Sequence, residues 1–223
     1  MIKGVIIDFN GTLYLDHDLN RKAWGIAFDS VKPKDSNEDF SVINRANRPN
    51  NYLVSKAILE HFNIEPTEET IHKLADFKEL AYQKAVVEVK RDSLVKGVPL
   101  FIGYLRDHGI PYCIASMAPK INFDFYFRYL HLGDFFSYDN IVYDDGTYFN
   151  KNSQIIDAAK RMNLDVKDCL IVEDTPENIN LAIEKLGADK FIYFNSRNME
   201  YSKKEILQEI KDYTEVDYKI FNN

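Results

Sequence analysis

The chain has 223 residues, of which 45% are hydrophobic, so it can bury a large core in one domain, with or without an insertion. Its 35 acidic and 28 basic residues give a formal net charge of -7 with no long block of either sign, which argues against general nucleic-acid binding. No apolar stretch approaches the roughly 20 residues that cross a bilayer, and the N-terminus lacks a basic region followed by an apolar one. We therefore expect a cytoplasmic protein with no membrane or nucleic-acid partner.

The first predicted element is a buried strand at residues 2–9, whose apolar and β-branched side chains lead to a carboxylate, Asp8. Residues 16–94 follow, with no convincing strand and several amphipathic stretches such as NYLVSKAILEHF. We therefore predict a helical domain of residues 16–94, inserted into a core domain of residues 1–15 and 95–223.

Strands and helices alternate through the rest of the chain. Short apolar or aromatic runs predict buried strands at residues 110–116, 169–173 and 190–194. Apolar positions at helical spacing predict helices at residues 100–105, 155–162 and 179–186. This alternation implies an α/β fold with a parallel sheet and right-handed crossovers. The segment 201–216 is predicted to form a final amphipathic helix.

Polar side chains stand at the carboxyl ends of three predicted strands: Asp8, Ser116, and the pair Glu173 and Asp174. Ligands of open parallel sheets bind in the crevice outside these ends, so we expect the three strands to aim polar groups at one place. Each residue could instead serve a local helix start, as Ser116 and Thr175 would by capping one. Unrelated helix caps would give no reason for this particular order and spacing of the residues, so we favour a shared site.

The order and spacing of these segments resemble the haloacid dehalogenase (HAD) superfamily over nearly the whole chain. DFNGTL resembles the first family motif, Asp-x-Asp-Gly-Thr-Leu/Val, and IPYCIAS matches the second, a hydrophobic strand that ends in Ser or Thr. LIVEDTPENI resembles the fourth, in which Glu-Asp-Ser/Thr-x-x-x-Ile follows hydrophobic residues. The resemblance implies a Rossmann-like core, with a C1-type cap in residues 16–94, as in subfamily I phosphatases and β-phosphoglucomutases.

The third family motif, a lysine at a helix start, is less clean in this sequence. We favour Lys151 in YFNKNSQII, which lacks the prolines of the usual Lys-Pro-x-Pro-Asp. The alignment then needs a local deletion of about two positions. Lys120 in SMAPK is the alternative, and either lysine could simply be a solvated surface residue.

The resemblance implies an Mg²⁺-dependent phosphatase in which Asp8 attacks phosphorus and forms an aspartyl-phosphate. Magnesium prefers oxygen ligands and needs only one or two protein carboxylates. Asp8, Asp174 and the backbone carbonyl of Asn10 would hold the ion, with Glu173 as a further ligand or close by.

The remaining motif residues would act on the phosphoryl group, according to the same resemblance. Ser116 would hydrogen-bond a phosphoryl oxygen, and Lys151 would neutralise the nucleophile and the charge that develops during transfer. Gly11 and Thr12 would contribute to substrate binding.

Asn10 departs from the family, because phosphate-transferring relatives carry there an aspartate that acts as general acid and then as general base. An amide has no titratable proton and cannot do either. Loss of such a group typically costs about 10²- to 10⁴-fold in rate.

Four interpretations of Asn10 stay open. It is natural, in an enzyme with slow turnover or with a leaving group that needs no protonation, or it is engineered to trap a complex. It could mark a non-phosphatase branch such as the dehalogenases, although the acidic pair in VEDT argues against them, and an Asn-Gly pair is also prone to deamidation. Asn-Gly is in addition a common turn pair. We favour the natural or engineered variant of a phosphatase-like site.

Substrate choice should belong to the cap. VINRANRPNNYL resembles the Gly-Arg-x-Asn segment of related caps, which would place Arg45 over the site to bind a substrate phosphate or carboxylate. Arg48 is the alternative, and an exposed loop arginine is about as good an interpretation. Four residues follow the first motif where the chain enters the cap, and we expect some to face the cleft: Tyr14, Asp16, His17 and Trp24.

Two functional hypotheses follow. In the first, the protein is an Mg²⁺-dependent HAD hydrolase that uses Asp8 on a small phosphorylated metabolite, with a sugar phosphate as a candidate, and Asn10 makes it slow. In the second, it is a non-catalytic or very slow HAD-fold protein that binds a phosphorylated ligand or partner. A mutase is disfavoured because it needs the same acid/base. The sequence indicates neither the substrate nor the oligomeric state.

Overall fold

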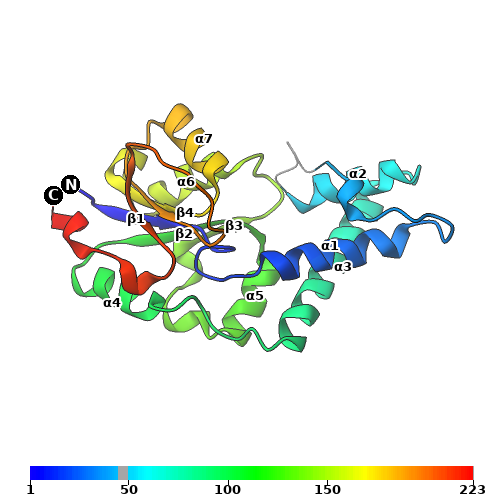
Figure 1. Ribbon diagram of the computed structural model, residues 1–223, viewed down its shortest axis with the longest axis horizontal. Helices are drawn as coiled ribbons and strands as arrows, with labels where there is room; N and C mark the ends of the chain where they lie inside the picture. Colours follow the sequence, from blue (N-terminus) through cyan, green and yellow to red (C-terminus); the bar gives the residue numbers. More distant parts are fainter. Residues whose placement is uncertain (45–49, 223) are drawn as a thin grey trace.

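The computed structural model describes residues 1–44 and 50–222, within which six parallel strands form one sheet in the order β3-β2-β1-β4-β5-β6 (Figure 1). The strands are β1 (Gly4–Ile7), β2 (Tyr112–Pro119), β3 (Ile141–Asp144), β4 (Cys169–Glu173), β5 (Phe191–Phe194) and β6 (Ile206–Ile210). Strand β1 pairs with β2 on one side and with β4 on the other, so it occupies the centre of the sheet. The predicted Rossmann-like α/β fold is confirmed.

Helices cover both faces of the sheet. They are α4 (Val98–Asp107) and α5 (Lys120–Tyr129) on one face, and α6 (Lys151–Arg161) and α7 (Pro176–Leu186) on the other (Figure 1). Successive strand residues point to opposite faces, so Ile7 lies in the apolar core that includes α4 and α5, whereas Ile6 lies in the core beneath α6 and α7. Both isoleucines are fully buried, which explains why the sequence of β1 is apolar without alternation.

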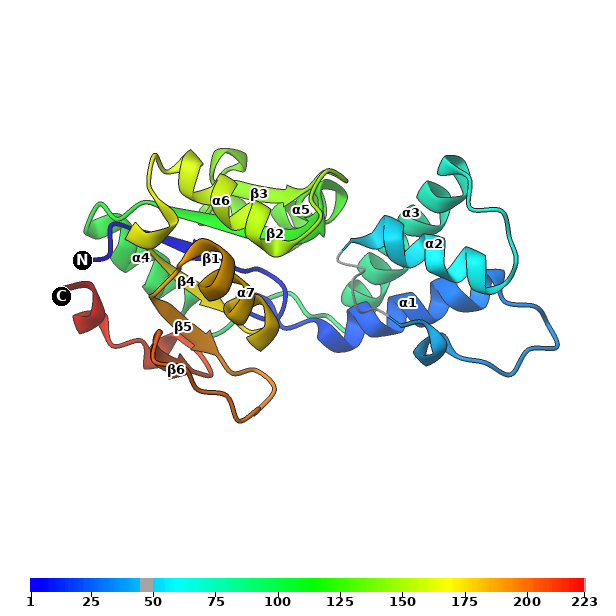
Figure 2. The ribbon, with the colours of Figure 1, turned by 90° about the horizontal axis from the view of Figure 1, so that it is seen from above.

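The described residues between 16 and 94, here called the helical region, contain no strand. Their helices are α1 (His17–Val31), α2 (Asn51–His61) and α3 (Glu68–Glu88). These helices bury an apolar core of their own around Trp24, Phe28 and Ile58. Figure 2 shows the helical region to one side of the sheet.

Two connecting segments join the helical region to the sheet, one before α1 and one after α3. Arg91 in the second segment donates hydrogen bonds to the carbonyl oxygen of Leu15, at 2.8 Å, and to Asp18 Oδ2, at 3.1 Å. In return, the hydroxyl of Tyr14 donates to the carbonyl oxygen of Arg91 at 2.6 Å. The two segments are therefore bound to each other where the chain crosses between the two parts.

The predicted final helix at residues 201–216 is wrong. Its central part forms β6, which pairs in parallel with β5 and extends the sheet. Along β6 the exposed side chains of Leu207 and Glu209 alternate with less exposed ones, and this is the period of a strand. The sequence analysis also missed β3 and α5. Within the described ranges, no helix combines the length and the apolar character that a membrane span needs.

Candidate active site

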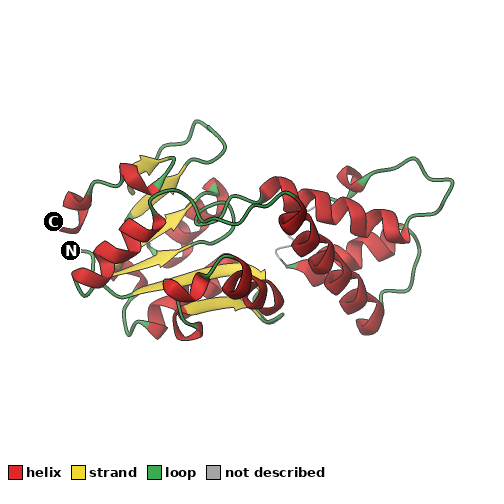
Figure 3. Cartoon of the chain, turned by 90° about the horizontal axis from the view of Figure 1, so that it is seen from below, coloured by secondary structure: helices red, strands yellow, loops and turns green. Residues whose placement is uncertain are grey.

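A polar cavity of about 350 Å³ lies at the carboxyl ends of the central strands, between the sheet and the helical region. Figure 3 shows the strands pointing toward the helical region. The core side contributes residues near the carboxyl ends of strands and one at the start of a helix: Asp8, Asn10, Ser116, Glu173 and Asp174, and Lys151. The sequence motifs thus converge on one cavity, as expected for a parallel sheet.

Asp8 lies at the end of β1 and is 8% exposed. Its Oδ1 accepts a short hydrogen bond from Lys151 Nζ, and its Oδ2 accepts one from Thr12 Oγ1 at 3.0 Å. Burial raises the pKa of Asp8, while the charge of Lys151 opposes this shift. Asp8 is therefore a buried carboxylate that depends on one lysine for its counter-charge.

Lys151, the first residue of α6, is nearly inaccessible to solvent. Besides its contact with Asp8, its ammonium lies 3.6 Å from Glu173 Oε2. Burial lowers the pKa of Lys151, but the carboxylates of Asp8, Glu173 and Asp174 together outweigh this and raise the pKa overall, so the lysine stays charged. The competing candidate, Lys120, lies away from this cluster and pairs with Asp124 at 2.7 Å on the surface.

Glu173 and Asp174 end β4, and together with Asp8 they place carboxylate oxygens within 4.8 Å of one another. Burial raises the pKa of Glu173 to about 8, and its Oε2 is buried without a hydrogen bond. Burial also opposes the charged form of Asp174, but the hydrogen bond and charge of His17, with the charge of Arg197, lower its pKa overall. His17 Nε2 lies 3.0 Å, and Arg197 Nη2 3.3 Å, from Asp174 Oδ2.

This carboxylate group fits a hard divalent cation. The three acids are buried around one buried lysine and lie close enough together to offer their oxygens to a single ion. Their oxygens are the ligand type that Mg²⁺ prefers, and the unbonded oxygen of Glu173 is free to take part.

Asn10 stands beside this cluster, and its amide is fixed by three neighbours. Its Nδ2 donates to Asp16 Oδ2 at 2.6 Å and to the hydroxyl of Tyr126 at 3.1 Å. Its Oδ1 accepts a hydrogen bond from Ser116 Oγ at 3.3 Å. Asp16 also accepts from the hydroxyl of Tyr82 at 2.5 Å, and burial raises the pKa of Asp16 to about 6 against these donors. A carboxyl group therefore adjoins position 10, although it is carried by residue 16.

The other predicted residues differ in where they lie. Asp16 and His17 line the cavity. Trp24 instead packs in the core of the helical region, and Tyr14 packs in the core of the sheet. Gly11 and Thr12 do not line the cavity: Thr12 is buried beneath Asp8, and Gly11 has a positive φ of 88° where a side chain would collide with His17 and Asp174. Arg45 and Arg48 lie outside the described residues.

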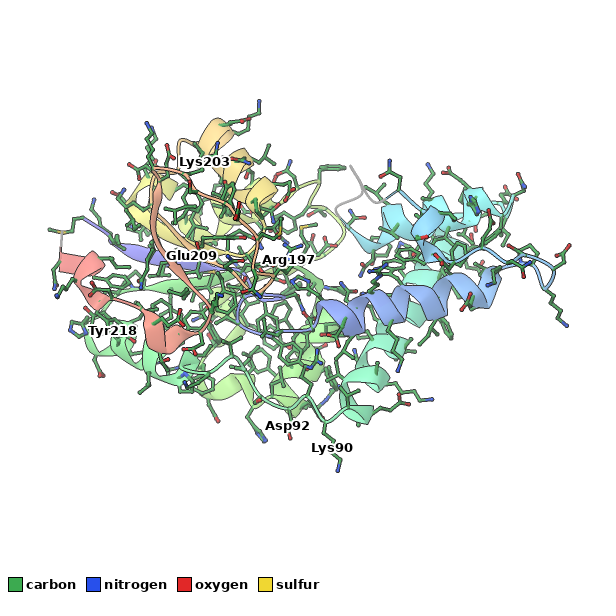
Figure 4. The ribbon with its side chains drawn as sticks, in the orientation of Figure 1. Lys90, Asp92, Arg197, Lys203, Glu209 and Tyr218 are labelled. Carbon is green, nitrogen blue, oxygen red and sulfur yellow. The ribbon has the colours of Figure 1, made fainter. Side chains whose placement is uncertain are left out.

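The sequence analysis missed the wall that the helical region and α5 provide, with Asn20, Asn51, Lys78, Glu79, Tyr82, Asn122 and Tyr126. Glu79 organises part of it by accepting hydrogen bonds from Lys78 at 2.9 Å and from Asn122 at 2.6 Å. Arg197 was also missed, although it follows β5 and the rule of strand ends would have found it (Figure 4). No motif marks the residues of α3, whose charges resemble those of an exposed helix face.

Comparison with known proteins identifies the class. A model of the family described as haloacid dehalogenase-like hydrolase matches residues 2–185, so the chain belongs to this family of hydrolases. Its structure is similar to a HAD hydrolase, family IA, variant 3 from Entamoeba histolytica, with 26% identity, a TM-score of 0.78 and coverage of 98% of this chain and 96% of the other.

Two more distant similarities add detail. The β-phosphoglucomutase of Clostridium difficile is 18% identical, with a TM-score of 0.73 over 100% of this chain and 96% of the other, and shows the same fold. A bifunctional riboflavin kinase/FMN phosphatase of Arabidopsis thaliana is 29% identical over 105 residues. This match spans 46% of the chain but only 27% of that relative's length.

Proposed function

We propose that the protein is a phosphohydrolase that moves a phosphoryl group from a small phosphorylated metabolite to Asp8 and then to water. The observation that carries this proposal is the buried contact between Asp8 and Lys151, next to the acidic pair that ends β4. Sugar phosphates are our first candidates, because structural neighbours include a β-phosphoglucomutase. The phosphatase named in the plant relative supports the same reaction class.

The chain's own residues account for the two steps. In the first, an oxygen of Asp8 forms a bond to phosphorus while the bond from phosphorus to the leaving oxygen breaks. Lys151 would balance the charge of Asp8 and of the phosphoryl oxygens, and Ser116, which lines the same cavity, would donate a hydrogen bond to one of them. In the second, water attacks phosphorus, inorganic phosphate leaves, and the carboxylate of Asp8 is restored.

A magnesium ion is part of the proposal. Asp8, Asp174, the backbone carbonyl of Asn10 and Glu173 would hold it, and when bound it would neutralise the phosphate that approaches the carboxylates. We further propose that residues 16–94 act as a cap domain over the core of residues 1–15 and 95–223. Both parts line the cavity, so closure would exclude water from it.

Asn10 sets the expected rate. Its amide cannot protonate the leaving oxygen, so the proton must come from another group or from the substrate, and we expect slow turnover. Asn10→Asp would restore the aspartate of the family, but it would also place one carboxylate against another, because Asn10 contacts Asp16 at 2.6 Å. The double variant Asn10→Asp/Asp16→Asn keeps one carboxyl and one amide and reverses the hydrogen bond.

The test is phosphate release from a panel of sugar and nucleotide phosphates with Mg²⁺, after mass spectrometry confirms residue 10. We expect Asp8→Asn to abolish turnover. We expect Asn10→Asp, alone or in the double variant, to raise kcat by about 10²- to 10⁴-fold. If both Asn10→Asp proteins stay inert with every ester, the second candidate function, a non-catalytic binder of a phosphorylated ligand, takes its place. Asn10 is the observation that favours that alternative.

A further inference from the structure

Two side chains at the start of α1 have acceptor atoms without a partner in the part of the chain that the structure describes. Asp16 Oδ1 and Asn20 Oδ1 are both buried, and neither accepts a hydrogen bond from residues 1–44 or 50–222. Both residues line the cavity that contains Asp8. Buried polar atoms are nearly always paired in folded proteins, so unpaired ones in a cavity call for an explanation.

Asp16 is the N-cap residue of α1, but its side chain makes no cap hydrogen bond. An aspartate at this position ordinarily accepts a hydrogen bond from a backbone N–H of the first turn, which stabilises the helix. Here Oδ2 accepts instead from Asn10 and Tyr82, and Oδ1 remains unused. The side chain thus does not cap the helix, and it is held by two donors that themselves line the cavity.

Asn20 lies one helical turn after Asp16, and residues four apart lie on the same face of a helix. The backbone confirms the turn, because Asn20 N donates to the carbonyl oxygen of Asp16 at 2.9 Å. The two free acceptors are therefore neighbours on one edge of the cavity. Asn10 connects this edge to the reacting carboxylate, because it follows Asp8 by two residues and contacts Asp16.

We infer that Asp16 and Asn20 form a subsite that accepts hydrogen bonds from hydroxyl groups on the leaving part of the substrate. This inference rests on the proposed function, and it narrows the substrates to phosphate esters of hydroxylated compounds. A site built to pair with a hydroxyl discriminates strongly against the analogue that lacks it, because its own polar atoms are then left unpaired. Asp16 and Asn20 are specificity residues in this account.

The experiment compares glycerol phosphate with propyl phosphate, which has the same carbon chain without the hydroxyls. Binding is measured by calorimetry in the Asp8→Asn protein, so that the result does not depend on turnover, and kcat and KM are measured in the parent. We expect glycerol phosphate to bind at least about 10-fold more tightly. In Asp16→Asn and in Asn20→Ala, glycerol phosphate should lose most of this advantage while propyl phosphate changes less than twofold. Asp29→Asn, an exposed change on the same helix, is the control.

Four results would overturn the inference. The first is equal binding of the two esters to the parent protein, and the second is an equal loss of binding for both esters in the Asp16 and Asn20 variants. The third is a fall in kcat for every ester at unchanged binding, which would assign Asp16 a role in proton transfer. The fourth is clear preference for ethanolamine phosphate, which would make the ligand an ammonium group. If the parent and Asn10→Asp are inert but the binding preference holds, only the proposed function fails.

Discussion

The two walls of the cavity are built differently. On the core side, Asp8, Lys151 and Glu173 come from the ends of strands and the start of a helix, and their charged groups contact one another. On the side of the helical region, Asp16 and Asn20 leave acceptors unpaired inside the same cavity. The charged groups of the first wall contact one another, although Glu173 Oε2 has no hydrogen bond, whereas the second wall holds two acceptors that have no partner among the described residues. Under the proposed function, the first wall would carry out the phosphoryl transfer and the second would select the substrate.

Charge separates the two walls as well. The core wall buries three carboxylates around Lys151. In the other wall the buried Lys78 is paired with Glu79 at 2.9 Å and lies about 5.2 Å from the centre of the Trp24 ring. That ammonium has both a carboxylate and an aromatic face as partners, so the wall is close to neutral at this point.

The largest effect should come from removing the buried ammonium group of Lys151 from the core wall. In Lys151→Met, Asp8 loses its counter-charge, so turnover should fall by about 10²- to 10³-fold. The free energy of unfolding at pH 7 should fall by about 3–5 kcal/mol, because buried carboxylates remain unpaired. Phosphate release and urea denaturation measure the two effects. Lys120→Met, at the exposed pair with Asp124, is the control and should change stability by less than about 1 kcal/mol. Similar losses in both variants would show that Lys151 has no special role.

Metal binding should distinguish the two walls of the cavity as well, through a somewhat smaller change in the free energy of unfolding. If the carboxylates of the core wall hold Mg²⁺, the ion should stabilise the folded protein by about 2.7 kcal/mol at about 100 times its Kd. Thermal unfolding with Mg²⁺ and with EDTA measures this gain independently of catalysis. Asp174→Asn should remove most of the gain, whereas the exposed change Asp189→Asn should keep it. A gain that survives Asp174→Asn would place the ion elsewhere.

The smallest effect concerns a strand-end carboxylate outside this cavity. Asp144 ends β3, is 4% exposed and accepts a hydrogen bond from Gly146 N at 3.0 Å. Burial raises its pKa to about 6 from 3.8, so the folded state binds the proton more tightly than the unfolded state. Its stabilising contribution is complete below about pH 4 and is lost as the pH rises through about 6.

Asp144→Asn should therefore stabilise the protein at pH 8 by about 1–2 kcal/mol and have little effect at pH 4. Denaturant unfolding at the two pH values measures the difference. An equal effect at both would mean that Asp144 carries no such burial cost. The expected result would distinguish a carboxylate that merely loses solvation from those that the core wall holds beside a lysine.

The core wall could be predicted from sequence, and the reasons are local. Apolar runs that end in Asp8, Ser116 or Glu173 indicate buried strands, and parallel pairing brings such ends together. For the helical wall, the position just after the first motif was enough to expect Asp16 or His17 at the cleft, but the residues of α3 could not be predicted in this way. Lys78 and Glu79 lie in a charged amphipathic helix, and nothing local distinguishes a buried ion pair from a solvated one. The strand β6 was mistaken for a helix because its alternating pattern spans only five residues. The roles of the site residues remain predictions.

The bound connecting segments have a mechanical consequence. The hydrogen bonds of Arg91 and Tyr14 join the two connecting segments between the sheet and the helical region, so neither segment can move independently while these bonds are intact. If the helical region moves relative to the sheet, Asp16, which lies within the joined stretch between Leu15 and Asp18, should move least of the helical-region residues that line the cavity. Asp16 should then keep its distance from Asp8 whether the cavity is open or closed. It could therefore bind a substrate hydroxyl before the helical region moves.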